Sequence, residues 1–343
     1  MKTIAQRVRG ALLGAAFGDA LGAPTEFIRD VEQIKRRWPP RGPEQLDAPI
    51  ARVTDDTQMM LAVGEALSRV ERGAAADLAA ALRVAFITWY HDPENNRAPG
   101  GTCLRACQAL RDAGVSWQHA TVPGSKGCGA NMRVQPLGLL PGRVSNDDVA
   151  GMAQLQAAMT HGHPTGVAAA DATAMALRLL LTGVSADELV DRLVDYARSQ
   201  RDVYRTAWLG ELWRITQHES PEHYIARGWD EVLEVLGALR AALEDPRHDQ
   251  DPCIATGDAW IAEEALATGL HAFLLYPDSP IDALRRAATT RGDSDSIACL
   301  TGAFAGAYLG EQAWPDEWFE RIEYADELER IAQVCLSWGQ RPG

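Results

Sequence analysis

The residues most suited to chemistry are two short acidic clusters, each placed at the start of a helical run. One is Thr54-Asp55-Asp56-Thr57, ahead of the run 58–70, and the other is Asp293-Ser294-Asp295-Ser296, ahead of 297–309. Capping alone accounts for either cluster taken singly, since Ser, Thr and Asp are common N-caps and acids suit the positive end of a helix. Capping needs only one such residue, however, and carboxylates packed into one turn repel one another unless a cation offsets them. Carboxylate and hydroxyl oxygens are the donors that Mg²⁺, Mn²⁺ and Ca²⁺ prefer, so two converging helix starts could hold a pair of ions.

A third acidic signal lies near the N-terminus, in the segment Gly18–Phe27. Asp19 interrupts an otherwise apolar helical run, and a buried aspartate without a partner costs several kcal/mol. Glu26 follows Pro24 and therefore lies off the helix, where its carboxylate can point into a cleft. The alternative is a plain helix terminus with surface acids.

Two further segments could bind a ligand. Ser125–Arg133 is a glycine-spaced loop that leads into a helix, and such loops present backbone N–H groups to phosphate, although this one lacks the P-loop pattern and could be a simple connection. The sequence Thr160-His161-Gly162-His163-Pro164 indicates a metal site only weakly, because loop histidines are more often merely polar.

The elements that must position these residues are helices. Apolar residues recur at helical spacing in several long stretches, and period-2 runs of β-branched residues are nearly absent, so the sequence predicts an all-α fold. The clearest stretches are Asp77–Tyr90, Val167–Leu181, Asp230–Leu243, Ala259–Leu275 and Ile297–Leu309. Four irregular segments, Trp38–Ile50, His91–Gly101, Thr121–Gly142 and Asp245–Gly257, interrupt the pattern without resembling flexible linkers. We therefore predict a single helical domain over residues 1–343.

Composition excludes several classes of protein. The 343 residues carry a net charge of −14, which disfavours extended nucleic-acid binding and anionic membranes. The sequence contains no apolar run long enough to span a membrane, and Asp19 ends the signal-peptide-like start. Six cysteines without metal or disulfide spacing indicate reduced thiols and a cytoplasmic location.

Taken in order, the motifs resemble those of the ADP-ribosylglycohydrolases, whose founding bacterial members reactivate dinitrogenase reductase. The matching segments cover nearly the whole chain and are GDALGAPTEF (18–27), TDDTQMMLAV (54–63), RAPGGTCL (97–104), SKGCGANMR (125–133), MTHGHP (159–164), GDAWIAEEAL (257–266) and GDSDSIACLTGAFAGAYLG (292–310). Seven motifs in family order are a specific signal, although each alone is weak.

The resemblance implies a compact all-α bundle whose two Mg²⁺ or Mn²⁺ ions assist cleavage of a glycosidic bond at the distal ribose of ADP-ribose. It implies six metal ligands, Thr54, Asp55, Asp56, Asp293, Asp295 and Ser296, and assigns Glu26, Asp55 and Asp56 to catalysis. It places the ADP-ribose diphosphate on the loop Ser125, Lys126, Gly127, Cys128 and Gly129, with His161 also touching the ligand. Three positions depart from the family pattern: Ser296 replaces a common threonine, Cys128 a common asparagine, and Lys126 an aromatic residue of some members.

The predicted activity is removal of ADP-ribose from a modified protein or small molecule, with ADP-ribosyl-arginine as the first choice of linkage. The acidic surface suits a basic, arginine-modified target. A serine, nucleobase or free-metabolite linkage, and a role in immunity against an ADP-ribosylating toxin, are alternatives that the sequence leaves open. A different class of function, a catalytically silent ADP-ribose-binding or structural protein on the same fold, also remains, because fold does not determine function.

Overall fold

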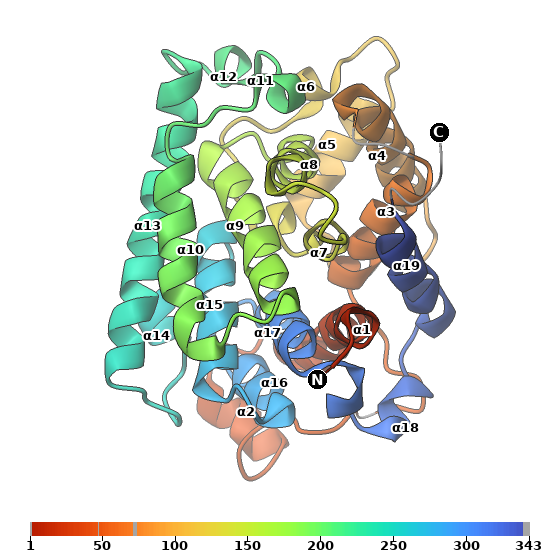
Figure 1. Ribbon diagram of the computed structural model, residues 1–343. Coiled ribbons are helices and arrows are strands. Elements are labelled where there is room, and N and C mark those ends of the chain that lie inside the picture. The colour runs from red at the N-terminus through yellow and green to blue at the C-terminus, as the bar shows by residue number, and fades with distance from the viewer. Residues whose placement is uncertain (1, 47, 71–73, 339–343) are drawn as a thin grey trace.

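The computed structural model describes residues 2–46, 48–70 and 74–338, and within these ranges its regular secondary structure is helical (Figure 1). The helices are α1 (Ile4–Gly22), α2 (Val31–Arg37), α3 (Asp55–Ser68), α4 (Ala75–Tyr90), α5 (Gly101–Leu110), α6 (Trp117–Ala120), α7 (Gln135–Gly138), α8 (Asn146–Ala158), α9 (Pro164–Leu181), α10 (Ala186–Gln200), α11 (Thr206–Leu209), α12 (Leu212–Ile215), α13 (Pro221–Glu244), α14 (Cys253–Thr256), α15 (Ala262–Leu275), α16 (Pro280–Ala288), α17 (Ser294–Leu309), α18 (Asp316–Phe319) and α19 (Ala325–Ser337), with 3-10 turns η1 (Ala23–Thr25), η2 (Cys128–Ala130) and η3 (Glu311–Ala313). In the part of the chain so described, β-structure is limited to three isolated bridges. The all-α prediction is confirmed.

The helix α9 passes through the middle of the molecule, with α10 and α13 to its left and α3, α4 and α19 to its right in Figure 1. Nearly every residue of α9 is buried, and α8, α13, α15 and α17 pack against it. Its sequence, rich in alanine and leucine with few polar residues, is typical of a helix that neighbours enclose on all sides.

The two helices that carry the predicted site, α1 and α17, lie against each other in opposite directions along a seam of small residues. A Cβ atom added at Gly14 would lie 2.2 Å from the carbonyl oxygen of Gly302, and one added at Gly18 would lie 1.9 Å from that of Ala298. Such distances are far below van der Waals contact, so the two backbones approach to a distance that only glycine permits. The seam brings the end of α1 next to the start of α17.

The predicted helical stretches correspond to α4, α9, α13, α15 and α17 with the ends shifted by a few residues, except that α13 begins at Pro221, well before the predicted start at Asp230. Two predicted irregular segments contain short helices: Thr121–Gly142 includes η2 and α7, and Asp245–Gly257 includes α14. A single turn is too short to show apolar periodicity, which explains the difference. Among the described residues, no helix is both long and apolar enough to cross a bilayer.

Candidate active site

Asp19 joins the end of α1 to the start of α3. Its side chain is 0% exposed and accepts hydrogen bonds from the backbone N–H of Thr54 (2.9 and 3.0 Å to the two oxygens). It also accepts from the backbone N–H of Thr57 at 3.1 Å and from the Thr57 hydroxyl at 2.5 Å. These bonds satisfy N–H groups that the first turn of a helix leaves open. Asp19 is therefore a buried connection between helices and not a surface acid.

The first turn of α3 carries the first acidic cluster. Thr54 is its N-cap, and the Thr54 hydroxyl accepts from the backbone N–H of Asp56 at 3.3 Å, so the capping interpretation holds for this one residue. Asp55 accepts from the backbone N–H of Gly100 at 3.2 Å. The Oδ1 atom of Asp56 is buried and lacks a hydrogen-bond partner among the described residues. A buried carboxylate oxygen without a donor is costly, and a cation is the usual remedy.

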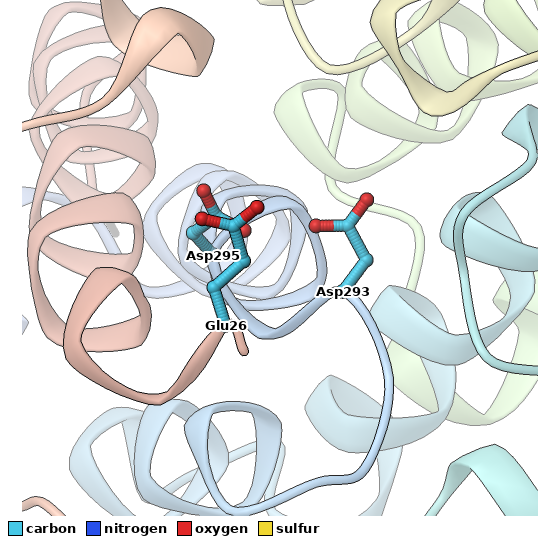
Figure 2. A group of neighbouring side chains, drawn as sticks. All are labelled: Glu26, Asp293 and Asp295. Carbon is cyan, nitrogen blue, oxygen red and sulfur yellow. The ribbon is translucent and has the colours of Figure 1, made fainter. Parts of the chain in front are cut away.

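The start of α17 meets Glu26, the residue that follows η1. Carboxylate oxygens of Glu26, Asp293 and Asp295 all lie within 4.8 Å of one another, and Figure 2 shows the three side chains projecting from the two segments toward a common space. The close approach depends on Gly22, where an added Cβ would lie 2.6 Å from the Cα of Asp295. The seam between α1 and α17 thus places Glu26 beside the second acidic cluster.

Both acidic clusters open onto one cavity of about 190 Å³. The described residues that line it are Glu26, Asp55, Asp56, Ala98, Gly100, Gly101, Thr102, Cys103, Gly127, Cys128, Gly129, Met132, His161, Trp260, Asp293, Asp295 and Ser296. Of the six predicted metal ligands, all but Thr54 are among them. None of these lining residues is a lysine or an arginine, so the five carboxylates face the cavity without a cationic partner of either type in its described wall.

Burial and mutual repulsion disfavour the charged forms of these acids. The pKa of Glu26 is raised to about 9 and that of Asp55 to about 8, first by desolvation and then by the charge of Asp295. The same causes raise the pKa of Asp56 well above its usual range, and burial with Asp295 likewise raises that of Asp293. A bound cation would reverse this effect, since opposite charge favours carboxylates. The oxygen donors and the unpartnered Asp56 oxygen therefore fit a divalent metal ion.

The predicted phosphate loop lies at the same cavity, but its five residues differ in where they point. Gly127, Cys128 and Gly129 line the cavity, and the thiol of Cys128 donates to Asp293 Oδ2 at 2.9 Å. Ser125 does not line it, and its hydroxyl lies 2.9 Å from that of Thr102.

Lys126 also points away from the cavity. Its ammonium group pairs with Glu231 of α13 at 2.7 Å and with the buried Glu263 of α15. Its backbone oxygen accepts from the N–H of Ala262 at 2.8 Å, which fastens the loop to the start of α15. The ammonium group of Lys126, a residue that the resemblance places in the diphosphate loop, is thus held by two carboxylates.

Sequence reasoning did not assign several residues that line the cavity. Trp260 is one, and the guanidinium of Arg29 lies 4.4 Å from the centre of its ring. Gly100 and Gly101 are others, and a Cβ added at Gly101 would meet nothing within 4 Å, so this stretch of wall is open. Ala98, with φ of 55°, turns the chain just before them. Trp260 lies in the motif GDAWIAEEAL, and Ala98, Gly100 and Gly101 lie in RAPGGTCL. Membership of these two motifs was the sequence signal that could have identified them as site residues.

Comparison with known proteins agrees with these observations. The family model described as ADP-ribosylglycohydrolase matches residues 1–342. The chain is 35% identical over 364 residues to an uncharacterized protein, YegU, of Escherichia coli K12, covering 99% of each. It is 28% identical to the ADP-ribosylarginine hydrolase Tri1 of Pseudomonas putida GB-1 (95% of this chain, 77% of the relative) and 26% identical to human ADP-ribosylhydrolase ARH3 (95% and 92%).

A solved structure titled ADP-ribosylglycohydrolase-related protein complex superposes with a TM-score of 0.66 at 24% identity, covering 99% of this chain and 100% of the other. At that identity the superposition establishes the fold alone. The family model, which spans almost the full length, establishes the family. This chain belongs to the ADP-ribosylglycohydrolases.

Proposed function

We propose that this protein is a divalent-metal-dependent hydrolase that releases ADP-ribose from a modified target by cleaving the glycosidic bond at the distal ribose, with ADP-ribosyl-arginine as its substrate. The observation that carries the proposal is the cavity in which five carboxylates, a glycine loop and His161 meet, with no lysine or arginine among the described lining residues. The arginine linkage is supported by the name of the Pseudomonas relative and by the net charge of −14, which suits a basic target.

Asp55, Asp56, Asp293, Asp295 and Ser296 would hold two Mg²⁺ or Mn²⁺ ions, with Thr54 beside them at the cap of α3. When bound, such ions neutralise the carboxylates and supply Lewis acidity toward ribose hydroxyls and water.

The chain's own residues have separate tasks in the reaction. Glycoside cleavage passes through an oxocarbenium-like state at the anomeric carbon. Glu26 accepts a proton from the attacking water while the water oxygen bonds to that carbon. The bond to the guanidine nitrogen breaks with its electron pair passing to the nitrogen, which takes up a proton from solvent, and Glu26 returns its proton to solvent.

The glycine loop binds the diphosphate in this proposal. The Cys128 N–H is already bonded to the Trp260 carbonyl at 3.1 Å, so the N–H groups of Gly127 and Gly129 are the donors to be tested.

A panel of defined linkages tests the activity. Release of free ADP-ribose is measured from peptides modified on arginine and on serine and from an ADP-ribosylated nucleobase, each with Mn²⁺, with Mg²⁺ and with EDTA. We expect metal-dependent release from the arginine substrate. Release only from another linkage would overturn the substrate assignment, and ADP-ribose binding without release from any substrate would favour the catalytically silent alternative.

Asp56→Asn and Asp187→Asn form a matched pair for the metal site. Both residues are the second of a helix, in α3 and α10, but Asp187 is exposed and lies outside the cavity. Equilibrium dialysis with Mn²⁺ should show lost binding for Asp56→Asn only. Equal Mn²⁺ content in both variants would mean that the acidic residues at the start of α3 only cap the helix and do not bind metal.

A further inference from the structure

Arg133 is a fully buried arginine whose direct hydrogen bonds all go to neutral groups. Its Nε donates to Gln156 Oε1 at 2.7 Å, and Nη2 donates to the Gln156 carbonyl at 2.8 Å and to the Thr160 hydroxyl at 2.7 Å. Its Nη1 faces the sulfur atoms of Met59 at 3.4 Å and Cys103 at 3.5 Å. These five contacts use all five N–H groups of the guanidinium. Within the described residues, no carboxylate forms an ion pair with Arg133.

The bond from Arg133 leaves the Thr160 hydroxyl hydrogen available for the next bond. The Thr160 hydroxyl has one hydrogen, and because it accepts from Arg133 Nη2, that hydrogen is free to go elsewhere. Two acceptors are near: the Ala157 carbonyl at 3.4 Å and His161 Nδ1 at 2.8 Å. An O–H donor prefers 2.5–3.0 Å, so the distances favour donation to His161 Nδ1 over donation to the Ala157 carbonyl.

A neutral imidazole that accepts on Nδ1 carries its proton on Nε2. Burial, with the charges of Arg133 and Arg105, holds the pKa of His161 well below its usual range, so the ring is neutral. Its Nε2 faces the glycine loop, since a Cβ added at Gly127 would lie 3.3 Å from that atom. The cavity wall therefore presents an N–H donor beside the loop.

We propose that Thr160, oriented by Arg133, is a positioning residue that fixes His161 as the Nε2–H tautomer, so that His161 donates a hydrogen bond to a phosphate oxygen of the ligand. The inference rests on the proposed function only in naming the diphosphate as that ligand. It adds a side-chain donor to the backbone N–H groups of the loop, whereas the Lys126 ammonium is held by Glu231 and Glu263. Arg133 contacts the cavity-lining residue Cys103 directly and the cavity-lining residue His161 through Thr160.

The tautomer is measured by ¹⁵N NMR on the full-length protein with labelled histidine, and ADP and ADP-ribose affinities are measured by calorimetry. In the wild type, His161 should show a protonated Nε2 and an unprotonated Nδ1. Thr160→Val keeps the shape of the side chain but removes the donor, so the tautomer should change or become mixed. Affinity for both ligands should then fall by about 2–10-fold, the range for one neutral hydrogen bond.

Two comparisons separate this role from general damage. Thr160→Ser keeps the hydroxyl and should restore both the tautomer and the affinity. Thr301→Val makes the same change at another fully buried threonine, whose hydroxyl bonds only the carbonyls of Gly269 and Ile297, and should leave ligand affinity unchanged.

The outcomes also distinguish the two proposals. A proton on Nδ1 in the wild type would overturn the tautomer assignment even if the hydrolase is active. An unchanged affinity in Thr160→Val would overturn its role in binding. If the wild type binds neither ADP nor ADP-ribose, the diphosphate assignment fails with the proposed function, while the NMR result still decides the tautomer.

Discussion

Replacing Gly14 with alanine should destabilise this protein, although the same change usually stabilises a helix. Alanine is favoured over glycine inside a helix by about 1 kcal/mol. At Gly14, however, the new Cβ would lie 2.2 Å from Gly302 O and 2.5 Å from a ring carbon of Trp314. Optimal carbon contacts are near about 3.5 Å, so α1 and α17 must part by more than about 1 Å at this level. Overpacking of this kind costs about 1–3 kcal/mol, and we expect a net loss of that order.

Gly237 provides the matched control, because it also lies inside a helix (α13) but a Cβ there would meet nothing within 4 Å. Gly237→Ala should raise the free energy of unfolding by about 0.4–1 kcal/mol. Urea denaturation of both variants measures the difference, and Mn²⁺ titration reports whether separation of the helices also weakens the site at Glu26 and Asp295. A Gly14→Ala protein at least as stable as the wild type would refute the packing argument.

Three further predictions concern the cavity. Glu26→Gln should lower turnover by about 10²–10⁴ while ADP-ribose affinity, measured by calorimetry, stays near that of the wild type; an unchanged rate would remove Glu26 from the mechanism. Gly127→Val should weaken binding of ADP and ADP-ribose but not of ribose, with circular dichroism as the fold control. If the variant binds all three ligands as tightly as the wild type, the loop only connects helices and does not bind phosphate. Without metal, stability should fall as pH rises from about 4 to about 9, because Asp55 and Glu26, with pKa values of about 8 and about 9, keep protons in the folded state that the unfolded chain releases. The slope is about 1.4 kcal/mol per pH unit for each retained proton, and urea denaturation in EDTA and in Mg²⁺ should show it only in EDTA.

The helical architecture and the acidic clusters could be predicted from sequence because both depend on neighbours in the chain. The long helices have apolar periodicity within one segment, and N-cap residues mark where α3 begins. The role of Asp19 could be predicted only as a need for a partner, since Thr54 and Thr57 lie more than thirty residues away.

Contacts across the fold account for what sequence reasoning missed. Lys126 and its partners Glu231 and Glu263 are 105 and 137 residues apart, and no local pattern indicates which charges will pair. A glycine every four residues in α1 was visible, but its meaning depended on the facing glycines of α17. The proposed tautomer of His161 likewise depends on Arg133, which reaches Thr160 from another segment.

Contacts within the chain hold the acidic residues together, which explains why their close approach is tolerated despite their mutual repulsion. Asp19 binds the start of α3 by four hydrogen bonds, and the glycine seam fixes the start of α17 beside Glu26. Neither contact needs a metal ion, so the carboxylates cannot separate to relieve their repulsion and take up protons instead. The oxygen donors are therefore preorganised for a cation that would displace those protons, and little of the binding free energy would be lost to ordering the chain. Metal binding should therefore leave the helical content unchanged, in contrast to small metal-folded domains.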